Sequence, residues 1–440
     1  MTWTIFDTWI VITGGIAAMA CALAGNWLIL RKMSMMGDAL SHAVLPGLAV
    51  AFLLTGTRTS LAMLLGAVLV GLVTTFLISA IERWGGVEAD AAMGVTFTAL
   101  FAIGLILIRV AAHDTDLDPD CVLYGALELT YLDSYQIGET VIPRAAVAGA
   151  VMLLVNLIFV VALFKELTIS AFDPEMANTQ GINATLMHYL LMMIVAATTV
   201  AAFNSVGSIL VIAMLVVPGA CARLLTNRLS VMIALSLVVA ALCAVLGHGA
   251  ALIVPGWFGL ADEANTAGSM ATMAGLLFGA TVLLAPQRGL IPQAWRRLSL
   301  AVTVTREDIL GLLWRAGEKA DHHRAEVEEA QIRGVLATGL LGRVAFALAL
   351  RKMRHKRRIH RQSGMISLTE RGEHYAARMI RRHRLWEGYL VQEAGIRPDH
   401  VHGTAERLEH ITDAQMLEAL DKATGSPAID PHEKVIPREE

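Results

Sequence analysis

Long apolar stretches separated by short polar segments occupy roughly the first two thirds of the 440-residue chain. A helix needs about 20 mostly apolar residues to cross a bilayer, and nine stretches meet this requirement. No basic residue precedes the first stretch, since the first one is Arg31, so we interpret it as a retained span and not as a signal peptide. The predicted spans are residues 8–30, 38–57, 60–81, 92–112, 145–164, 185–204, 206–222, 231–254 and 267–286.

The pattern changes near residue 287, after which charged residues become frequent. Residues 1–287 hold nine of the 35 lysines and arginines, and residues 288–440 hold the other 26. Residues 288–302 are basic and contain proline, which predicts a linker. From Thr303 onward apolar residues recur at helical spacing, with Thr305 as the predicted N-cap of the first helix. We therefore expect an all-α polytopic membrane domain followed by a soluble, mainly helical region.

The composition agrees with this division and excludes several classes of protein. Apolar residues make up 55% of the chain and charged residues 17%, and the mean hydropathy is +0.58. These values are typical of a membrane protein and exclude a disordered chain or a nucleic-acid-binding tail. The cysteines lack CxxC or CxxH spacing, so we expect packing residues and neither a disulfide framework nor a zinc site. They are Cys21, Cys121, Cys221 and Cys243.

The distribution of basic residues predicts the orientation of the spans. Loops on one side of the predicted spans carry nine lysines and arginines, whereas the opposite loops are acidic at residues 114–120 and 262–263. Loops rich in lysine and arginine stay on the cytoplasmic side of a membrane. We therefore predict a multi-pass protein of the inner (plasma) membrane, with its N-terminus outside and its soluble region cytoplasmic.

Ionisable residues lie within the predicted spans, where charge is costly and usually marks a pathway or a site. Asp38 and His42 are four residues apart and share one helix face, and a carboxylate with an imidazole suits Mn²⁺, Fe²⁺ or Zn²⁺. The alternative is an N-cap at Asp38 and a histidine satisfied by a neighbouring helix. His248, flanked by glycines, is a further candidate ligand, whereas a structural role is favoured for His188.

Four segments of the membrane region resemble one family. Residues 37–47 (GDALSHAVLPG) closely resemble the signature of the permeases of manganese, zinc and iron ABC transporters. Similar segments follow at residues 117–125 (LDPDCVLYG), at 171–177 (AFDPEMA) with Gly181, and at 207–219 (GSILVIAMLVVPG). They occur in order across about residues 1–290, so the resemblance covers the whole predicted membrane domain.

This resemblance implies a permease subunit that pairs with a second permease chain, receives metal from an extracytoplasmic metal-binding protein and is driven by a separate cytoplasmic ATPase. It implies that Asp38 and His42 line the metal path. The chain has no GxxxxGK[ST] loop, so we expect no ATP hydrolysis and no enzymatic activity of its own. A short helix capped by Asp173 is also expected. The resemblance makes it the segment that couples to the ATPase, formed by Phe172, Asp173, Pro174 and Glu175 with Gly181.

Histidine and glutamate recur at ligand spacing in the soluble region. His383 and Glu387 lie one helical turn apart. A second helix face carries His402, Glu406, Glu409 and His410. These nitrogen and oxygen ligands suit Mn²⁺ or Fe²⁺, and the alternative is two charged, solvated helix faces.

The soluble region resembles metal-dependent repressors of the diphtheria-toxin and manganese-regulator type over about residues 303–437. The matching segments are residues 368–372 (LTERG), 381–385 (RRHRL), 401–402 (VH), 405–410 (AERLEH), 430–432 (DPH) and 436–437 (IP). The resemblance implies a winged helix-turn-helix at 303–374 and a helical metal-binding and dimerisation region at 375–440. It implies metal ligands at Asp308, His383, Glu406, Glu409 and His410, with Gly311 where a further glutamate would stand. Glutamate at position 406 favours the manganese type.

The same region argues against sequence-specific DNA binding. Residues 344–349 (VAFALA) leave almost nothing to hydrogen-bond base edges. Residues 351–361 contain seven lysines and arginines and no acidic residue, a pattern that suits membrane lipid, phosphate or a solvated face.

Together these features predict the permease subunit of an ABC transporter that imports a divalent transition metal. Manganese or iron is favoured and zinc stays open, with the metal as substrate and as ligand of a cytoplasmic sensing domain. The alternative is a membrane-tethered, metal-responsive transcription regulator, although nine spans with a pathway signature exceed what a tether needs.

Overall fold

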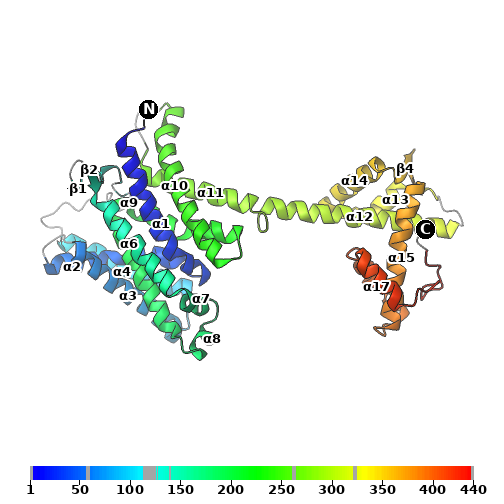
Figure 1. Ribbon diagram of the computed structural model, residues 1–440, viewed down its shortest axis with the longest axis horizontal. Coiled ribbons are helices and arrows are strands. Elements are labelled where there is room, and N and C mark those ends of the chain that lie inside the picture. The colour runs from blue at the N-terminus through cyan, green and yellow to red at the C-terminus, as the bar shows by residue number, and fades with distance from the viewer. Residues whose placement is uncertain are drawn as a thin grey trace. The chain divides into compact units, whose positions relative to one another are not determined.

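A computed structural model describes residues 3–55, 60–111, 125, 127–137, 140–259, 264–320 and 325–437 (Figure 1). The chain divides into two compact units, Met1–Pro292 and Gln293–Glu440. The acidic segments at 114–120 and 262–263, Cys121 and most of the segment at 117–125 lie outside the described residues.

Helices build the first unit, as predicted. Within the described residues, nine helical segments are long and apolar enough to cross a membrane, and each overlaps one predicted span. The predicted class, a polytopic all-α membrane domain, is confirmed. A short antiparallel hairpin of β1 (Ser134–Ile137) and β2 (Thr140–Pro143) follows η2 (Leu127–Leu129), and the sequence did not predict it. The helices are α1 (Ile5–Leu30), α2 (Met35–Thr55), α3 (Ser60–Gly85), α4 (Ala89–Ala111), α6 (Arg144–Ala162), α7 (Phe164–Phe172), α8 (Pro174–Thr179), α9 (Ala184–Leu225), α10 (Leu229–Trp257) and α11 (Thr266–Leu284).

The sixth and seventh predicted spans are the two halves of α9. The helix breaks at Gly207, whose φ of 74° and ψ of 167° are not helical. Only glycine adopts this conformation without strain. Gly125 packs against the same point, where a Cβ on it would lie 2.5 Å from the backbone nitrogen of Gly207. The break is therefore a built feature that two glycines make possible.

Helix α1 forms the centre of the first unit and contacts α6, α9 and α10. A Cβ on Gly25 would overlap the carbonyl oxygen of Leu215, so glycine lets α1 and α9 meet closely. The buried amide of Asn26 donates to the carbonyl of Ala22 at 2.8 Å and to the hydroxyl of Ser236 at 2.7 Å. Because an unpaired polar group is costly inside a bilayer, this bond fixes α10 against α1.

The second unit begins with a winged helix-turn-helix arrangement, as the resemblance implies. The turn between α13 and α14 joins two helices, and the hairpin of β4 and β5 follows as the wing. The antiparallel sheet has the order β3-β5-β4. Buried Ile309, Leu313, Phe346 and Ile366 belong to its core. The elements are α12 (Leu290–Ala320), β3 (Val327–Glu328), α13 (Glu329–Leu336), α14 (Gly339–His355), β4 (Ile359–Gln362) and β5 (Met365–Leu368).

The prediction of a helix N-cap at Thr305 is wrong. Helix α12 already begins at Leu290, so Thr305 is a buried residue in its interior and residues 290–302 are helical. The helical spacing of apolar residues extends back through Val302 and Leu298, which belong to the same core or pack against it. Pro292 lies in the first turn, where its missing N–H has no helical partner to lose.

Three helices and the chain end complete the second unit. The long helix α15 (Glu370–Gln392) is capped by Thr369, whose hydroxyl accepts from the backbone N–H of Gly372 at 3.1 Å. Helices α16 (His402–Glu409) and α17 (Ala414–Ala423) pack against α15 after the short η3 (Pro398–His400). Helix α15 thus carries His383 and faces both α16 and α17.

Candidate metal centres

The predicted intramembrane pair forms at the start of α2. The Oδ1 of Asp38 and the Nε2 of His42 lie 3.4 Å apart, with 34% and 29% of their side chains exposed. The rings of Phe97 and Phe101, both from α4, lie with centroids 6.0 and 5.3 Å from that of His42. A carboxylate and an imidazole thus face each other beside an apolar wall, and both remain accessible to a divalent cation.

Close helix contacts hold α2 in place beyond this pair. The helix continues through Pro46 to Thr55. A Cβ on Gly47 would lie 2.5 Å from the carbonyl oxygen of Gly66 in α3, and one on Gly104 of α4 would lie 2.8 Å from the Cδ of Pro46. Small residues therefore let both neighbouring helices pack directly on α2.

His248 has partners of its own, from α1 and α11. Its Nε2 lies 3.1 Å from the Oδ1 of Asp7 in α1, and its Nδ1 lies 3.3 Å from the hydroxyl of Thr266 in α11. Both ring nitrogens thus face partners other than the pair in α2. A role for His248 as a path ligand therefore stays a prediction. His188 lies 3.3 Å from Arg31, in keeping with a structural role.

The predicted short helix after Phe172 is confirmed as α8. Asp173 caps it by accepting from the backbone N–H of Met176 at 2.9 Å, and Pro174 occupies its first turn. Gly181 follows the helix with φ of 83°, which favours glycine. Phe172 and Met176 are exposed, so the segment presents apolar side chains at its surface.

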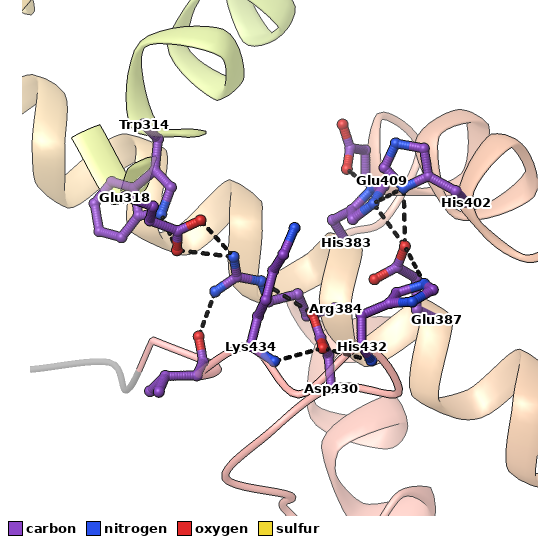
Figure 2. A network of polar contacts seen from close by, with 11 residues as sticks. Trp314, Glu318, His383, Arg384, Glu387, His402, Glu409, Asp430, His432 and Lys434 are labelled. Atoms are coloured by element: carbon purple, nitrogen blue, oxygen red, sulfur yellow. Dashed lines mark hydrogen bonds and ion pairs between the residues drawn. The ribbon is translucent and has the colours of Figure 1, made fainter. Parts of the chain in front are cut away.

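In the second unit, His383 of α15 lies in a cluster of carboxylates and histidines (Figure 2). Its Nδ1 lies 2.7 Å from the Oε2 of Glu409, and its Nε2 lies 3.1 Å from the Oε1 of Glu387 and 3.0 Å from the Nδ1 of His402. The Nδ1 of His402 also lies 2.9 Å from the same oxygen of Glu387. Glu409 accepts from the Nδ1 of His383 and so fixes the orientation of the ring. The opposite nitrogen, Nε2, therefore points toward Glu387 and His402.

A second group surrounds His410. Its Nδ1 donates to the Oε2 of Glu307 at 2.7 Å, which turns its Nε2 toward the Oδ1 of Asp308 at 3.8 Å and the Oε1 of Glu409 at 3.9 Å. Glu409 therefore stands between His383 and His410. Glu307 lies one helical turn before Gly311, the position that lacks the implied glutamate, and supplies a carboxylate to the same group.

Electrostatics distinguish these side chains. Burial alone would lower the pKa of His383, but Glu387 and Glu409 outweigh it and raise the pKa to about 9. Burial would raise the pKa of Glu387, but hydrogen bonds from His383 and His402 lower it to about 2. Burial raises the pKa of Asp308 to about 6. His410 opposes this shift, and the negative charges of Glu406, Glu409 and Glu307 add to it.

The donor set fits a divalent metal of borderline hardness. Ligand atoms of His383, Glu387 and His402 all lie within 4.8 Å of one another, and imidazole with carboxylate suits Mn²⁺, Fe²⁺ or Zn²⁺. Several acidic groups held in one small volume are also what a metal would neutralise, since carboxylates repel one another there. The resemblance implied ligands at Asp308, His383, Glu406, Glu409 and His410. The structure brings His383, Glu409, His410 and Asp308 together, and it places Glu406 near enough for its charge to act on Asp308.

Spacing had marked Glu387 and His402 as candidate ligands, although they are not among the ligands that the resemblance implies. Glu307, the partner of His410, was missed. His432 was also missed, and its Nε2 lies 3.8 Å from the Oε1 of Glu387. The signal for Glu387 was its spacing of four residues from His383, whereas nothing local to residue 307 indicates His410, which is 103 residues away.

A network of polar contacts around buried Arg384 and Asp430 connects this cluster to α12 (Figure 2). The backbone N–H of His432 donates to Asp430 at 2.8 Å, and the other carboxylate oxygen of Asp430 lies 3.3 Å from the Nε of Arg384. Arg384 also donates to the carbonyl of Val435 and to Glu318 of α12. Arg384 is the chain neighbour of His383, so the network begins beside the candidate metal ligands.

The fold and these sites define a polytopic membrane transport subunit joined to a repressor-like domain that carries a candidate metal centre. The chain belongs to the ABC 3 transport family, whose sequence model matches residues 5–278. Residues 369–438 match the iron dependent repressor, metal binding and dimerisation domain. Both resemblances drawn from the sequence are confirmed.

Similar proteins are named as metal transport components. The manganese transport system membrane protein MntD of Bacillus subtilis is 39% identical over 296 residues, which are 67% of this chain and 97% of that protein. The manganese transport system membrane protein MntC of the same organism is 30% identical over 422 residues, 94% of this chain and 91% of that one. The alignment with MntC therefore extends into the second unit.

The chain is also similar to a membrane protein named for zinc transport and to a protein of solved structure. The zinc transport system membrane protein TroD of Treponema pallidum is 35% identical over 282 residues, 64% of this chain and 75% of that one. The structure titled PsaBC from Streptococcus pneumoniae in complex with Fab is 32% identical with a TM-score of 0.53, and the match covers 65% of this chain and 94% of that chain. This match covers a share of the chain about equal to the first unit.

Proposed function

We propose that this chain is the permease subunit of an ABC importer for a divalent transition metal, and that Asp38 and His42 form a step of the metal path. The observation that carries the proposal is the 3.4 Å pairing of this carboxylate and imidazole at the start of α2. The residues lie within the segment that resembles the permease signature, in a chain that belongs to the ABC 3 transport family.

Manganese is the substrate we favour, ahead of iron and zinc. The similar proteins MntD and MntC are named for manganese, and TroD is named for zinc. One carboxylate and one imidazole form a site without thiolate, so zinc gains no advantage from sulfur. A path ligand must also release its ion, and two protein ligands with partial exposure suit rapid exchange.

The partners we propose follow from family membership and from α8. A separate ATPase would contact Phe172, Met176 and Glu175, which are exposed around the capped helix. A metal-binding protein would deliver the ion on the opposite face of the membrane, and a second permease chain would complete the path. ATP hydrolysis belongs to the ATPase in this proposal.

The orientation we propose has the N-terminus outside and the second unit in the cytoplasm. It rests on the basic residues of alternate loops, such as Arg31, Arg83 and Lys165, which would all face the cytoplasm. Helix α8 then faces the cytoplasm as well, where an ATPase can reach it.

The second unit serves, in this proposal, as a sensor of cytoplasmic metal that restrains the permease. His383, Glu387 and His402 would hold the ion, together with Glu409, which lies between this cluster and His410. A bound ion can shift the unit only if it favours one conformation. Closing the carboxylates around the ion is such a difference, and Arg384 connects that cluster with α12.

Metal uptake by whole cells tests the transport proposal. Cells that lack their own manganese importers would express the wild-type chain with its ATPase, or the Asp38→Asn or His42→Ala variant. We expect uptake to fall at least about tenfold in both, because even the outer partners of a metal ligand contribute that much to binding. Asp90→Asn, which alters an exposed carboxylate in the first turn of α4, should keep normal uptake.

Equal amounts of each variant in the membrane fraction exclude a folding defect. Competition of manganese uptake by Fe²⁺ and Zn²⁺ ranks the substrates. Normal uptake by both Asp38→Asn and His42→Ala would contradict the proposed path.

A further inference from the structure

One face of α14 changes from apolar to basic along its length. Leu340, Val344 and Leu348 are exposed at successive positions four residues apart, with 82% of Leu340 exposed. The same face continues as Arg351 and His355, three and seven residues further on. This exposed face is therefore apolar at the start of α14 and cationic at its end.

Helix α12 adds to this face. A cavity of about 980 Å³ lies between the two helices, and Trp295, which is 71% exposed, forms part of its wall. Apolar and cationic side chains line it together, among them Trp295, Leu298, Leu348, Arg351, Lys352 and Arg354. We call these residues, with Leu340 and Val344, the α14 face.

The cationic end of the face has no carboxylate partner within the described part of the chain. Among the described residues, Arg351, Lys352 and Arg354 form no ion pair with a carboxylate. A neighbouring cavity of about 430 Å³ is lined by further basic residues and Tyr375, and it includes Arg357 and Arg378. The positive charge therefore continues past the end of α14, and it would attract an anionic partner.

The chemistry of the face fits a membrane surface better than DNA. In a winged helix-turn-helix the second helix of the motif reads base edges, and α14 holds that position. Leucine and valine at its start offer no hydrogen bonds to bases. Leucine, valine and tryptophan beside arginine and lysine are instead the composition of helices that lie in the lipid interface.

The chain also keeps this face within reach of a bilayer. Five residues separate Leu284, the end of α11, from Leu290, the start of α12. An extended segment of that length spans at most about 20 Å. If α11 spans the membrane, as its length and composition allow, α12 must begin close to the membrane surface.

We propose that the α14 face binds anionic phospholipid of the cytoplasmic leaflet, with Leu340, Val344 and Trp295 entering the interface and Arg351, Lys352 and Arg354 contacting phosphate groups. This inference rests on the proposed cytoplasmic location of the second unit, and it does not depend on which metal is transported. Lipid binding would hold the repressor-like domain at the membrane, where its metal state can act on the permease.

Hydrogen exchange of the full chain in lipid nanodiscs tests this. Backbone amides of residues 340–358 should exchange more slowly in discs that contain phosphatidylglycerol than in discs of phosphatidylcholine alone. High salt should remove most of the difference, because exposed charges are screened. Each basic residue near an anionic leaflet contributes about fivefold to binding. Loss of three such charges should therefore lower the ratio of lipid-bound to unbound α14 face roughly a hundredfold, and reversing them should lower it further.

Two charge-reversal variants make the test specific. The first carries Arg351→Glu, Lys352→Glu and Arg354→Glu, and it should lose the lipid-dependent protection. The matched control reverses Arg397, Arg407 and Lys422, which are exposed elsewhere on the unit, and it should keep the protection. Metal uptake by the first variant should remain above background, which separates failure of this inference from failure of the permease proposal.

Three results would overturn the inference. Equal exchange of wild-type residues 340–358 in both kinds of disc would do so without any variant. Equal protection by inorganic phosphate in phosphatidylcholine discs would indicate a pocket for a free anion. Protection by duplex DNA, with none from phosphatidylglycerol, would indicate a nucleic-acid surface.

Discussion

The Nη2 of Arg384 donates to both carboxylate oxygens of Glu318, at 2.8 and 2.9 Å. Arg384 is buried in α15 directly after His383, and Glu318 belongs to α12, the helix that follows the last membrane span along the chain. A short path of charged groups thus runs from the candidate metal ligands to the helix that joins the two units in sequence. Movement of α15 at the metal cluster would shift Arg384 and change its contact with Glu318.

The Glu318→Gln variant should separate metal binding from its effect on transport. The substitution keeps the shape of the side chain but removes its charge. It should lower the free energy of unfolding by only about 1 kcal/mol, because 32% of the Glu318 side chain is exposed and solvent screens the ion pair. Manganese titration of the full chain should give the wild-type affinity, whereas inhibition of transport by internal manganese should weaken. Glu393→Gln, an exposed residue at the end of α15, is the control and should behave as wild type.

Glu307 should matter for metal binding although it faces the metal cluster only through His410. It accepts from the Nδ1 of His410 at 2.7 Å and so fixes the Nε2 toward Asp308 and Glu409. The resemblance implies His410 as a metal ligand, and an outer partner that orients a ligand histidine contributes about ten- to a hundredfold to metal affinity. Glu307→Gln should weaken manganese binding by that factor in calorimetry, while Glu370→Gln, an exposed first-turn acid of α15, should not. An unchanged affinity would remove Glu307 from the site.

Metal binding by the second unit should depend on pH over an unusual range. The pKa of His383 is raised from 6.5 to about 9, so the metal-free protein holds a proton there that the ion must displace. Manganese affinity should therefore keep rising from pH 6.5 to about 9, with proton release visible as a buffer-dependent heat in calorimetry. An affinity that stops rising near pH 7, as for an ordinary histidine, would contradict this.

The same shift has a defined sign for the stability of the metal-free protein. A histidine whose pKa is raised on folding stabilises the fold fully below its unfolded value of 6.5 and loses that contribution as the pH passes about 9. A control for the metal-binding prediction is His374→Ala, which alters an exposed histidine of the same helix. This variant should leave the pH dependence of manganese affinity unchanged.

The capped helix α8 should be needed for coupling to the ATPase. Changing Asp173, Pro174 and Glu175 together to alanine removes the cap, at a cost of about 1 kcal/mol in a six-residue helix. We expect co-purification with the ATPase and metal uptake to fall, with Asp38 and His42 unaffected. The double change Thr179→Ala and Gln180→Ala at the other end of α8 is the control. Full uptake and normal co-purification in the triple variant would exclude this docking role.

Local patterns in the sequence were sufficient for much of the fold. The nine spans follow from apolar length alone, and the helix at Asp173 and Pro174 follows from capping chemistry. Thr305 misled because threonine before acidic residues resembles a helix start, although apolar residues at helical spacing continue on both sides of it. The division of α9 was predicted as the gap between the spans at 185–204 and 206–222. The positive φ of Gly207 and its close contact with Gly125 were not, because they depend on packing between segments distant in the sequence.

The metal clusters were only partly predictable, since they assemble from helices distant in the chain. His383 and Glu387 are readable as one helix face, whereas the contact of Glu307 with His410 spans 103 residues. The carbonyl and carboxylate partners of Arg384 come from the chain end and from α12, and no spacing rule relates them.

We propose that metal held in the second unit restrains this permease. Manganese uptake into proteoliposomes containing the chain, its ATPase and internal ATP tests it most directly, with internal manganese varied before the reaction starts. Internal manganese should slow the wild-type transporter and should leave the His383→Ala, Glu409→Ala double variant near its unrestrained rate. Equal slowing of both, or a wild-type rate that does not respond to internal manganese, would contradict the claim.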